Sequence, residues 1–241
     1  MKITFAKLFK KLPFFAALRF SLLILVKKMM ANEANNYFSQ TGEDTVLKFL
    51  LRDRQDGVYV DIGCNTPIYF SNTFFLYVSG WNGICVDANE RLCQQFRKAR
   101  PFDTVVHAAV SDEVKEVTFH ISDKVPAVST IDQHQLEEWK KHWEFNREVK
   151  MMTQRVETIL DKHLPKGTPI DLLSIDVEGH DLNALRSVNL NKYRPRFIVI
   201  EIHEFKLSEN NDDPIVKYLK DNGYVLECFS TINGYFRDSR V

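Results

Sequence analysis

The sequence predicts an α/β protein built on a doubly wound, mostly parallel sheet of seven strands. Short apolar runs with the alternation of buried strands are separated by segments of helical spacing, the order of elements that produces such a sheet. Several of these runs end in an acid, as at Asp61, Asp87, Asp176 and Glu201. Because ligands bind outside the carboxyl ends of the strands in open parallel sheets, we expect these acids to gather around one cleft.

The first strand, 58–62, alternates β-branched residues with Tyr59 and Asp61 and closes on Gly63. The further strands we expect are 84–87, 104–110, 117–121 (short or merely extended), 170–175, 197–202, 224–229 and a last strand after the hairpin signal Asn233-Gly234. The expected helices are 39–51 with Ser39 as its cap, a helix around 74–77, 89–100, 156–163, 182–188 and 214–222. Residues 122–152 show no strong period. They form either an insertion over the ligand cleft or a surface helix with solvated charges.

Composition and charge narrow the class of protein. The 241 residues are 44% hydrophobic and 27% charged, as in an ordinary globular protein, and the formal net charge is zero. The first 32 residues hold seven basic residues and no acid, so the remainder carries 25 basic and 32 acidic residues, a net of −7. A mildly acidic body argues against nucleic acid as a partner. The four cysteines form no CxxC pair and no zinc spacing, and we expect reduced thiols, which suits the cytosol.

The N-terminal region differs from the rest, and we divide the chain into a basic amphipathic segment with its linker, 1–36, and a domain, 37–241. Phe14, Leu18, Leu22 and Leu25 recur at helical spacing among basic residues. The apolar run is shorter than the roughly 20 residues that span a bilayer. Residues 1–30 therefore lie on an anionic membrane surface, pack on the domain as a helix, or act as a targeting segment. We favour a cytoplasmic protein, peripheral on the cytoplasmic membrane face if this segment binds lipid.

The loop after the first strand restricts the ligand. Asp61-x-Gly63-x-Asn65 has one glycine and is not the GxGxxG of a dinucleotide site, which argues against a pyrophosphate at a helix N-terminus. A ligand with a ribose and an amino-acid tail but no phosphate suits this loop better, and S-adenosylmethionine is such a ligand. Asp87, at the end of the second strand, is placed for a ribose.

Five motifs together resemble the FkbM-type S-adenosylmethionine-dependent methyltransferases, over about residues 37–230. The motifs are Ser39-Gln40 with Gly42-Glu43-Asp44, Asp61-Ile62-Gly63-Cys64-Asn65, Ser71-Asn72-Thr73, Gly80-Trp81-x-Gly83, and Asp171-Leu172-Leu173-Ser174-Ile175-Asp176-Val177-Glu178-Gly179-His180. The resemblance implies a Rossmann-like class I methyltransferase fold with S-adenosylmethionine as cofactor. It also implies that Asp61, Gly63 and Asn65 line the methionine end of the cofactor, that Asp87 accepts from the ribose hydroxyls, and that Ser111 and Asp112 lie by the adenine.

Transfer of a methyl group to an alcohol requires removal of its proton, by a general base or with the help of a metal. Asp176 and Glu178 are two residues apart at the end of one expected strand, and Glu201 and His203 repeat this spacing on its expected neighbour. We expect these four catalytic residues to converge and favour a base and an orienting group without metal. A divalent cation is the alternative: oxygen ligands favour Mg²⁺ or Ca²⁺, and His203 admits Mn²⁺ or Zn²⁺.

These observations favour an O-methyltransferase that acts on a hydroxyl of a sugar, a glycolipid or a natural product. Two alternatives stay open at this point. The first is a nicotinamide-dependent oxidoreductase. The second is a membrane-tethered binding module that has the same fold but does not catalyse a reaction.

Overall fold

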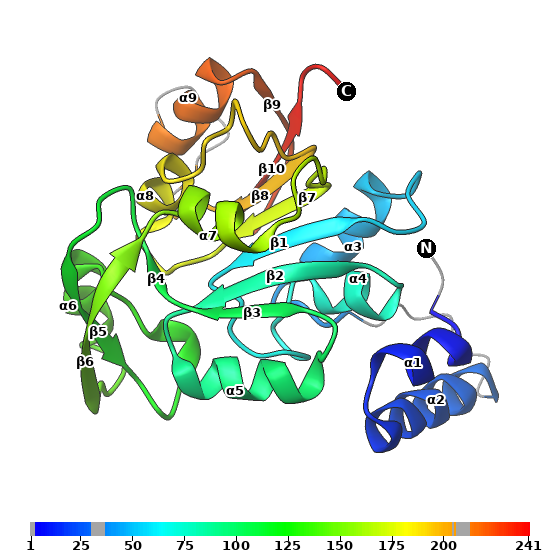
Figure 1. The fold of residues 1–241 in the computed structure, drawn as a ribbon. Coiled ribbons are helices and arrows are strands. Elements are labelled where there is room, and N and C mark those ends of the chain that lie inside the picture. The colour runs from blue at the N-terminus through cyan, green and yellow to red at the C-terminus, as the bar shows by residue number, and fades with distance from the viewer. Residues whose placement is uncertain (1–2, 30–36, 204, 206–212) are drawn as a thin grey trace.

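The protein is described by a computed structural model, which places residues 3–29, 37–203, 205 and 213–241 (Figure 1). The predicted linker at residues 31–36 lies outside the described residues.

One sheet of seven strands forms the centre of the molecule, in the order β3-β2-β1-β7-β8-β10-β9. Five strands run parallel, and β10 pairs antiparallel with both β8 and β9. The doubly wound, mostly parallel sheet predicted from the sequence is thereby confirmed. The strands are β1 (Val58–Ile62), β2 (Asn82–Asp87), β3 (Thr104–His107), β7 (Leu172–Ile175), β8 (Phe197–Glu201), β9 (Tyr224–Ser230) and β10 (Asn233–Asp238).

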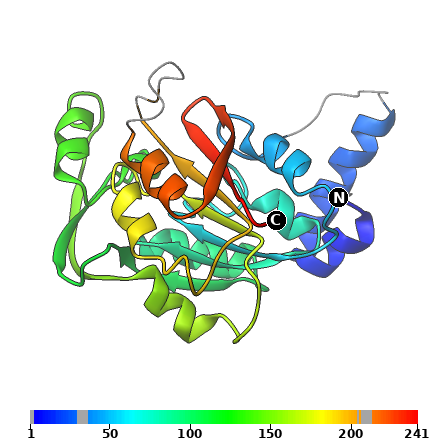
Figure 2. The same cartoon turned by 90° about the horizontal axis from the view of Figure 1, so that it is seen from above.

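Helices cover both faces of this sheet (Figures 1 and 2). In β1, Val60 and Ile62 pack into one buried cluster together with residues of α7, α8 and α9, whereas Tyr59 packs into a second cluster with residues of α3 and α4. The period-two alternation in the sequence thus supplies both cores. The helices are α1 (Phe5–Lys11), α2 (Phe14–Met29), α3 (Glu43–Leu50), α4 (Phe74–Val78), α5 (Glu90–Ala99), α6 (Gln133–Trp139), α7 (Val156–His163), α8 (Asp181–Arg186) and α9 (Pro214–Asp221).

The chain continues from β3 into a second, small sheet of three strands, in the order β4-β6-β5. The strand predicted at 104–110 is interrupted at Ala108: β3 stays in the main sheet, and β4 (Ala109–Val110) pairs with β6 (Arg147–Gln154) of the small sheet. β5 (Glu116–Ile121) pairs antiparallel with β6. The segment 122–152 is therefore an extension containing a 3₁₀ turn (Pro126–Val128), α6 and most of β6, rather than a surface helix alone.

The N-terminal helices pack against the domain. Leu8, Leu12 and Ala17 are buried in the cluster that contains Tyr77 and Trp81. The Lys11 ammonium donates to the carbonyl oxygen of Trp81 at 2.8 Å, and the Tyr77 hydroxyl donates to the carbonyl oxygen of Lys11 at 2.5 Å. α1 and α2 lie at the opposite end of the molecule from the small sheet (Figures 1 and 2).

The first helix of the domain starts later than predicted. Gly42 takes a left-handed conformation (φ 94°) at the N-cap of α3, so the helix begins at Glu43 rather than after Ser39. The Ser39 hydroxyl still accepts from the Asp44 N–H at 3.2 Å and donates to the Asp44 carboxylate at 2.9 Å. Ser39 therefore still satisfies one N–H group of the first helical turn, although Gly42 and not Ser39 is the N-cap residue.

Candidate active site

A cavity opens at the carboxyl ends of β1, β2 and β7, where open parallel sheets bind ligands. It contains about 880 Å³ of empty space, with the open solvent at its mouth included. Its walls come from the loops after these three strands, from the end of β4, and from the extension. Pro126, Ala127, Ser129 and Thr130 of the extension line it.

The loop after β1 depends on Gly63. Gly63 has φ +79°, and a Cβ built on it would lie 1.7 Å from the carbonyl oxygen of Asp176. Only glycine lets this loop lie directly against the loop after β7. Asn65 follows, also with positive φ (52°), and its buried Oδ1 has no hydrogen-bond partner among the described residues. Because Asn65 lines the cavity, this oxygen is an acceptor available to a ligand.

Asp87, at the end of β2, is prepared to accept hydrogen bonds. Its two carboxylate oxygens accept the N–H groups of Asn65 at 2.9 Å and of Asn89 at 2.7 Å. Burial raises its pKa to about 7, and the nearby Asp61 adds to this, while the two N–H donors oppose it. The position and acceptor atoms of Asp87 fit the ribose hydroxyls of a nucleoside.

A buried arginine that the sequence analysis missed holds Asp61 in place. The Thr73 hydroxyl donates to Asp61 Oδ2 at 2.5 Å and accepts from Arg100 Nη1 at 2.9 Å. Arg100 is fully buried, and its other nitrogens donate to the Ser71 hydroxyl and the Pro67 carbonyl oxygen, both at 2.6 Å. The Ser71-Asn72-Thr73 motif therefore connects the guanidinium to the first acid of the cavity. Burial is the main cause that raises the pKa of Asp61.

The residues that we expected by the adenine lie outside the cavity lining. The Ser111 hydroxyl lies 2.9 Å from His180 Nε2 and donates to the Asp112 carboxylate at 3.2 Å, and the Asn183 amide donates to the same carboxylate at 3.0 Å. The cavity wall near β4 is apolar instead. Its residues are Leu92, Ala108, Val110 and Phe119, and no motif in the sequence pointed to them.

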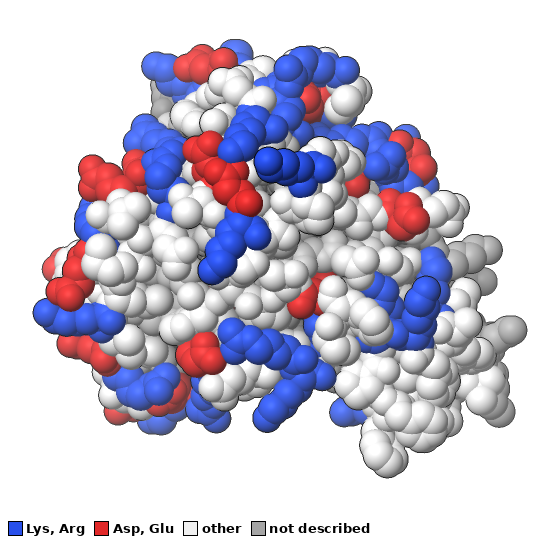
Figure 3. Space-filling model, viewed as in Figure 1, with Lys and Arg blue, Asp and Glu red and all other residues white. Residues whose placement is uncertain are grey.

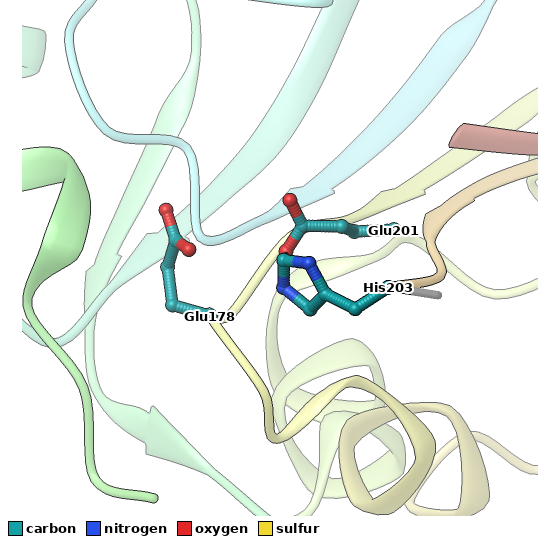
Figure 4. Close-up of side chains that lie close together, drawn as sticks. All are labelled: Glu178, Glu201 and His203. Carbon is teal, nitrogen blue, oxygen red and sulfur yellow. The ribbon is translucent and has the colours of Figure 1, made fainter. Parts of the chain in front are cut away.

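The four acid and histidine positions at the ends of β7 and β8 do come together. Asp176 and Glu178 line the cavity, while Glu201 and His203 line a neighbouring hollow bordered by Leu182 and Ile215. Ligand-type atoms of Glu178, Glu201 and His203 all lie within 4.8 Å of one another (Figure 4). The Glu201 carboxylate is 3.0 Å from His203 Nε2.

The loop that carries Glu178 is fixed from two sides. Glu178 has φ 56°, and its carbonyl oxygen accepts from the Thr130 hydroxyl of the extension at 2.8 Å. On the other side, Asp181 accepts the N–H groups of Val177 at 3.0 Å and Gly179 at 3.1 Å. Asp181 is a further buried acid that the sequence analysis did not single out, and burial raises its pKa to about 7.

The electrostatics of the cavity favour a cationic ligand. Asp61, Asp87, Asp176 and Glu178 line it, and no Lys, Arg or His is among the described residues that do. Burial, followed by repulsion from neighbouring acids, raises the pKa values of Asp176 and Glu178 well above their ordinary range. A positive charge bound in the cavity favours their ionised forms. S-adenosylmethionine, with its sulfonium and ammonium groups and no phosphate, fits this donor and acceptor set.

The fold and the cavity thus define a protein of the S-adenosylmethionine-dependent methyltransferase class. Comparison with known protein families agrees with this. The model of the FkbM methyltransferase domain matches residues 61–226. This chain belongs to the FkbM methyltransferase family, and it is an S-adenosylmethionine-dependent methyltransferase.

Among solved structures, the chain is similar to a TehB-like S-adenosylmethionine-dependent methyltransferase from Corynebacterium glutamicum. The sequence identity is 12%, the TM-score is 0.43, and the alignment covers 90% of this chain and 96% of that one. No curated protein gives a significant match to the sequence.

Proposed function

We propose that the protein methylates a hydroxyl group of a sugar, a glycolipid or a natural product. The observation that supports this most is the placement of two carboxylates, Asp176 and Glu178, in the cavity wall, with Glu201 and His203 in the lining of the neighbouring hollow. A hydroxyl oxygen becomes a good nucleophile only as its proton leaves, so an acceptor of this kind needs a base at the point of transfer.

The residues that would hold the cofactor follow from their acceptor atoms. Asp87 would accept from the ribose hydroxyls, and Asn65 and Asp61 would accept from the ammonium end. When bound, S-adenosylmethionine supplies an activated methyl group whose sulfur keeps the electron pair of the broken bond. Asp176 takes the proton of the acceptor hydroxyl while the new oxygen–carbon bond forms. Glu178 and the Glu201–His203 pair orient the hydroxyl and exclude other geometries.

The competing functions make different demands on the cavity. A nicotinamide dinucleotide carries a pyrophosphate, and no basic side chain is among the described residues that line the cavity to bind it. A binding module without turnover would leave the cofactor unchanged.

The test of the proposed function is incubation of the full chain with S-adenosylmethionine and a panel of hydroxyl acceptors, followed by mass spectrometry. We expect S-adenosylhomocysteine and a methylated hydroxyl, both lost in Asp176→Asn. Product on nitrogen or sulfur acceptors only would contradict the proposal.

We also propose that the N-terminal helices bind an anionic lipid surface. One face of α2 packs on the domain, whereas Phe14, Phe15, Leu18, Leu22 and Leu25 are exposed, with Phe15 82% accessible. The lobe that α1 and α2 form shows mainly uncharged side chains (Figure 3). Lys10 of α1 and Arg19 of α2 are exposed, and Lys27 and Lys28 follow the apolar residues in the sequence. None of the described helices is long and apolar enough to cross a bilayer.

The buried side of α1 and α2 rules out deletion of the segment as a test of lipid binding. Deleting the segment would uncover Tyr77 and Trp81, so a truncated chain would confuse loss of binding with loss of folding. Phe15→Glu changes only the exposed face, and Phe49→Glu on α3, 64% exposed, is the matched control. We expect sedimentation with vesicles rich in phosphatidylserine for the unchanged protein and for Phe49→Glu, and loss of sedimentation for Phe15→Glu. Equal sedimentation of both variants, or none for the unchanged protein, would exclude the lipid surface.

A further inference from the structure

The side chains at the ends of β7 and β8 form a group with the composition of a metal site. Glu178 comes from the loop after β7, Glu201 is the last residue of β8, and His203 follows two residues later. Their two carboxylates and the imidazole border one small space (Figure 4), with a ligand-type atom from each within 4.8 Å of the others. Among the described residues, no other group of three or more acid, histidine or cysteine side chains meets this condition.

The burial of Glu201 provides a second, independent observation. Glu201 is only 4% exposed, and its Oε2 has no hydrogen bond of acceptable geometry, although His203 Nε2 lies 3.0 Å away. The buried Asp176 Oδ1, one strand across, also has no hydrogen-bond partner among the described residues. A buried carboxylate oxygen without a donor is costly unless a cation neutralises it. No guanidinium or ammonium group of the described residues lines this cavity.

We propose that Glu178, Glu201 and His203 bind one divalent cation beside the cofactor cavity. Two carboxylates and one imidazole suit Mn²⁺ or Zn²⁺ better than Ca²⁺, which prefers oxygen ligands throughout. Ligand atoms about 2.1 Å from one ion are at most about 4.2 Å apart, and roughly 3.4 Å apart in a tetrahedral site, so the site closes with side-chain shifts of up to about 1.4 Å.

The location assigns the ion a role in the proposed reaction. Glu178 belongs to the cavity wall, and Glu201 and His203 belong to the neighbouring hollow, so the ion lies where the two spaces meet. An acceptor hydroxyl that enters through the hollow would reach the ion before it reaches the cavity. A divalent cation lowers the pKa of a bound hydroxyl and holds its oxygen in one orientation, which leaves Asp176 to take the proton. This role rests on the proposed function, but metal binding itself does not.

The experiment measures binding of Mn²⁺ to the full chain after treatment with a chelator, without cofactor or acceptor. Electron paramagnetic resonance reports the free ion directly. We expect one Mn²⁺ per chain with a Kd below about 1 mM, competition by Zn²⁺, and affinity at least tenfold weaker in both Glu201→Gln and His203→Ala. Thermal unfolding shows whether each variant remains folded.

The matched control is a second histidine–glutamate pair that lacks a third ligand. His120 Nδ1 lies 3.1 Å from Glu148 Oε1 in the small sheet, and His120→Ala should leave Mn²⁺ binding unchanged. Absence of stoichiometric binding up to about 1 mM, or unchanged affinity in folded Glu201→Gln and His203→Ala, overturns the metal site. Because methyl transfer is not part of this readout, a failed metal site and a failed methyltransferase assay are separate results.

Discussion

Gly63 offers the sharpest test of how the cavity is built. In Gly63→Ala, the new Cβ would lie 1.7 Å from the Asp176 carbonyl oxygen, about half of an ordinary contact distance of roughly 3.5 Å. The obstacle is backbone rather than a side-chain end, so the loops after β1 and β7 must separate. The left-handed φ of +79° adds its own penalty.

Gly167→Ala separates these two costs. Gly167 has nearly the same φ, +80°, and a Cβ there meets no atom within 4 Å. We expect Gly167→Ala to lower the free energy of unfolding by about 1–2 kcal/mol. Gly63→Ala should lose the same amount plus about 1–3 kcal/mol for the steric conflict.

The assays are urea denaturation and calorimetric titration with S-adenosylmethionine. Cofactor affinity should fall at least about tenfold in Gly63→Ala, or about 1.4 kcal/mol, and stay unchanged in Gly167→Ala. If the two variants match in stability and in cofactor affinity, the contact between the two loops does not shape the cavity as described.

Three further predictions address other parts of the site. Asp87 has its pKa raised to about 7, so the folded state keeps a proton that the unfolded chain loses near pH 4, and stability should fall as pH rises from about 4 to about 7. Binding of methylthioadenosine, a neutral nucleoside with the same ribose, should tighten from pH 6 to pH 8. Asp87→Asn should abolish this dependence of binding but only reduce the dependence of stability, because burial also raises the pKa of Asp181 to about 7; a flat binding profile in the unchanged protein contradicts this role. Arg100→Met should cost about 3–5 kcal/mol in urea denaturation and weaken cofactor binding, because it leaves Asp61, Ser71 and Thr73 without their buried cation. Arg97→Met, which breaks only an exposed pair with Glu90, should cost less than about 1 kcal/mol, and equal losses would refute the special place of Arg100. Thr130→Val should lower kcat/KM severalfold with a stability loss near 1 kcal/mol, because the extension no longer holds the Glu178 carbonyl; unchanged kinetics would separate the extension from the reaction.

The main sheet could be predicted because its strands are buried. In β1, β7 and β8 nearly every residue is covered, so their apolar runs stand out in the sequence, and the acids that end them mark the carboxyl edge. β6 was missed for the opposite reason. Seven of its eight residues are exposed or only partly buried, and its charged residues give no apolar face from which a period can be recognised.

The candidate site shows the same limit. The sequence predicted that Asp176, Glu178, Glu201 and His203 converge, because both pairs stand at the carboxyl ends of neighbouring strands. The period of a strand does not extend to Glu178 and His203, which lie in the loops after β7 and β8. Arg100 could not be found in this way. It follows directly after a helix, where a basic side chain ordinarily reaches solvent near the last carbonyl groups. Only the folded structure shows that its guanidinium group donates hydrogen bonds to the Ser71 and Thr73 hydroxyls.

The packing of α1 and α2 on the domain bears on geometry as well as on location. A segment joined only by a loose linker would let the domain turn freely above a lipid surface. Here Leu8 and Leu12 are buried and Lys11 bonds the Trp81 carbonyl, so the exposed apolar face keeps one angle to the main sheet. If α2 binds the bilayer, the mouth of the cavity would then have a fixed distance and a fixed orientation relative to the membrane surface. A lipid-anchored acceptor would have to present its hydroxyl at that distance, so the length between its anchor and its hydroxyl would determine whether it is a substrate.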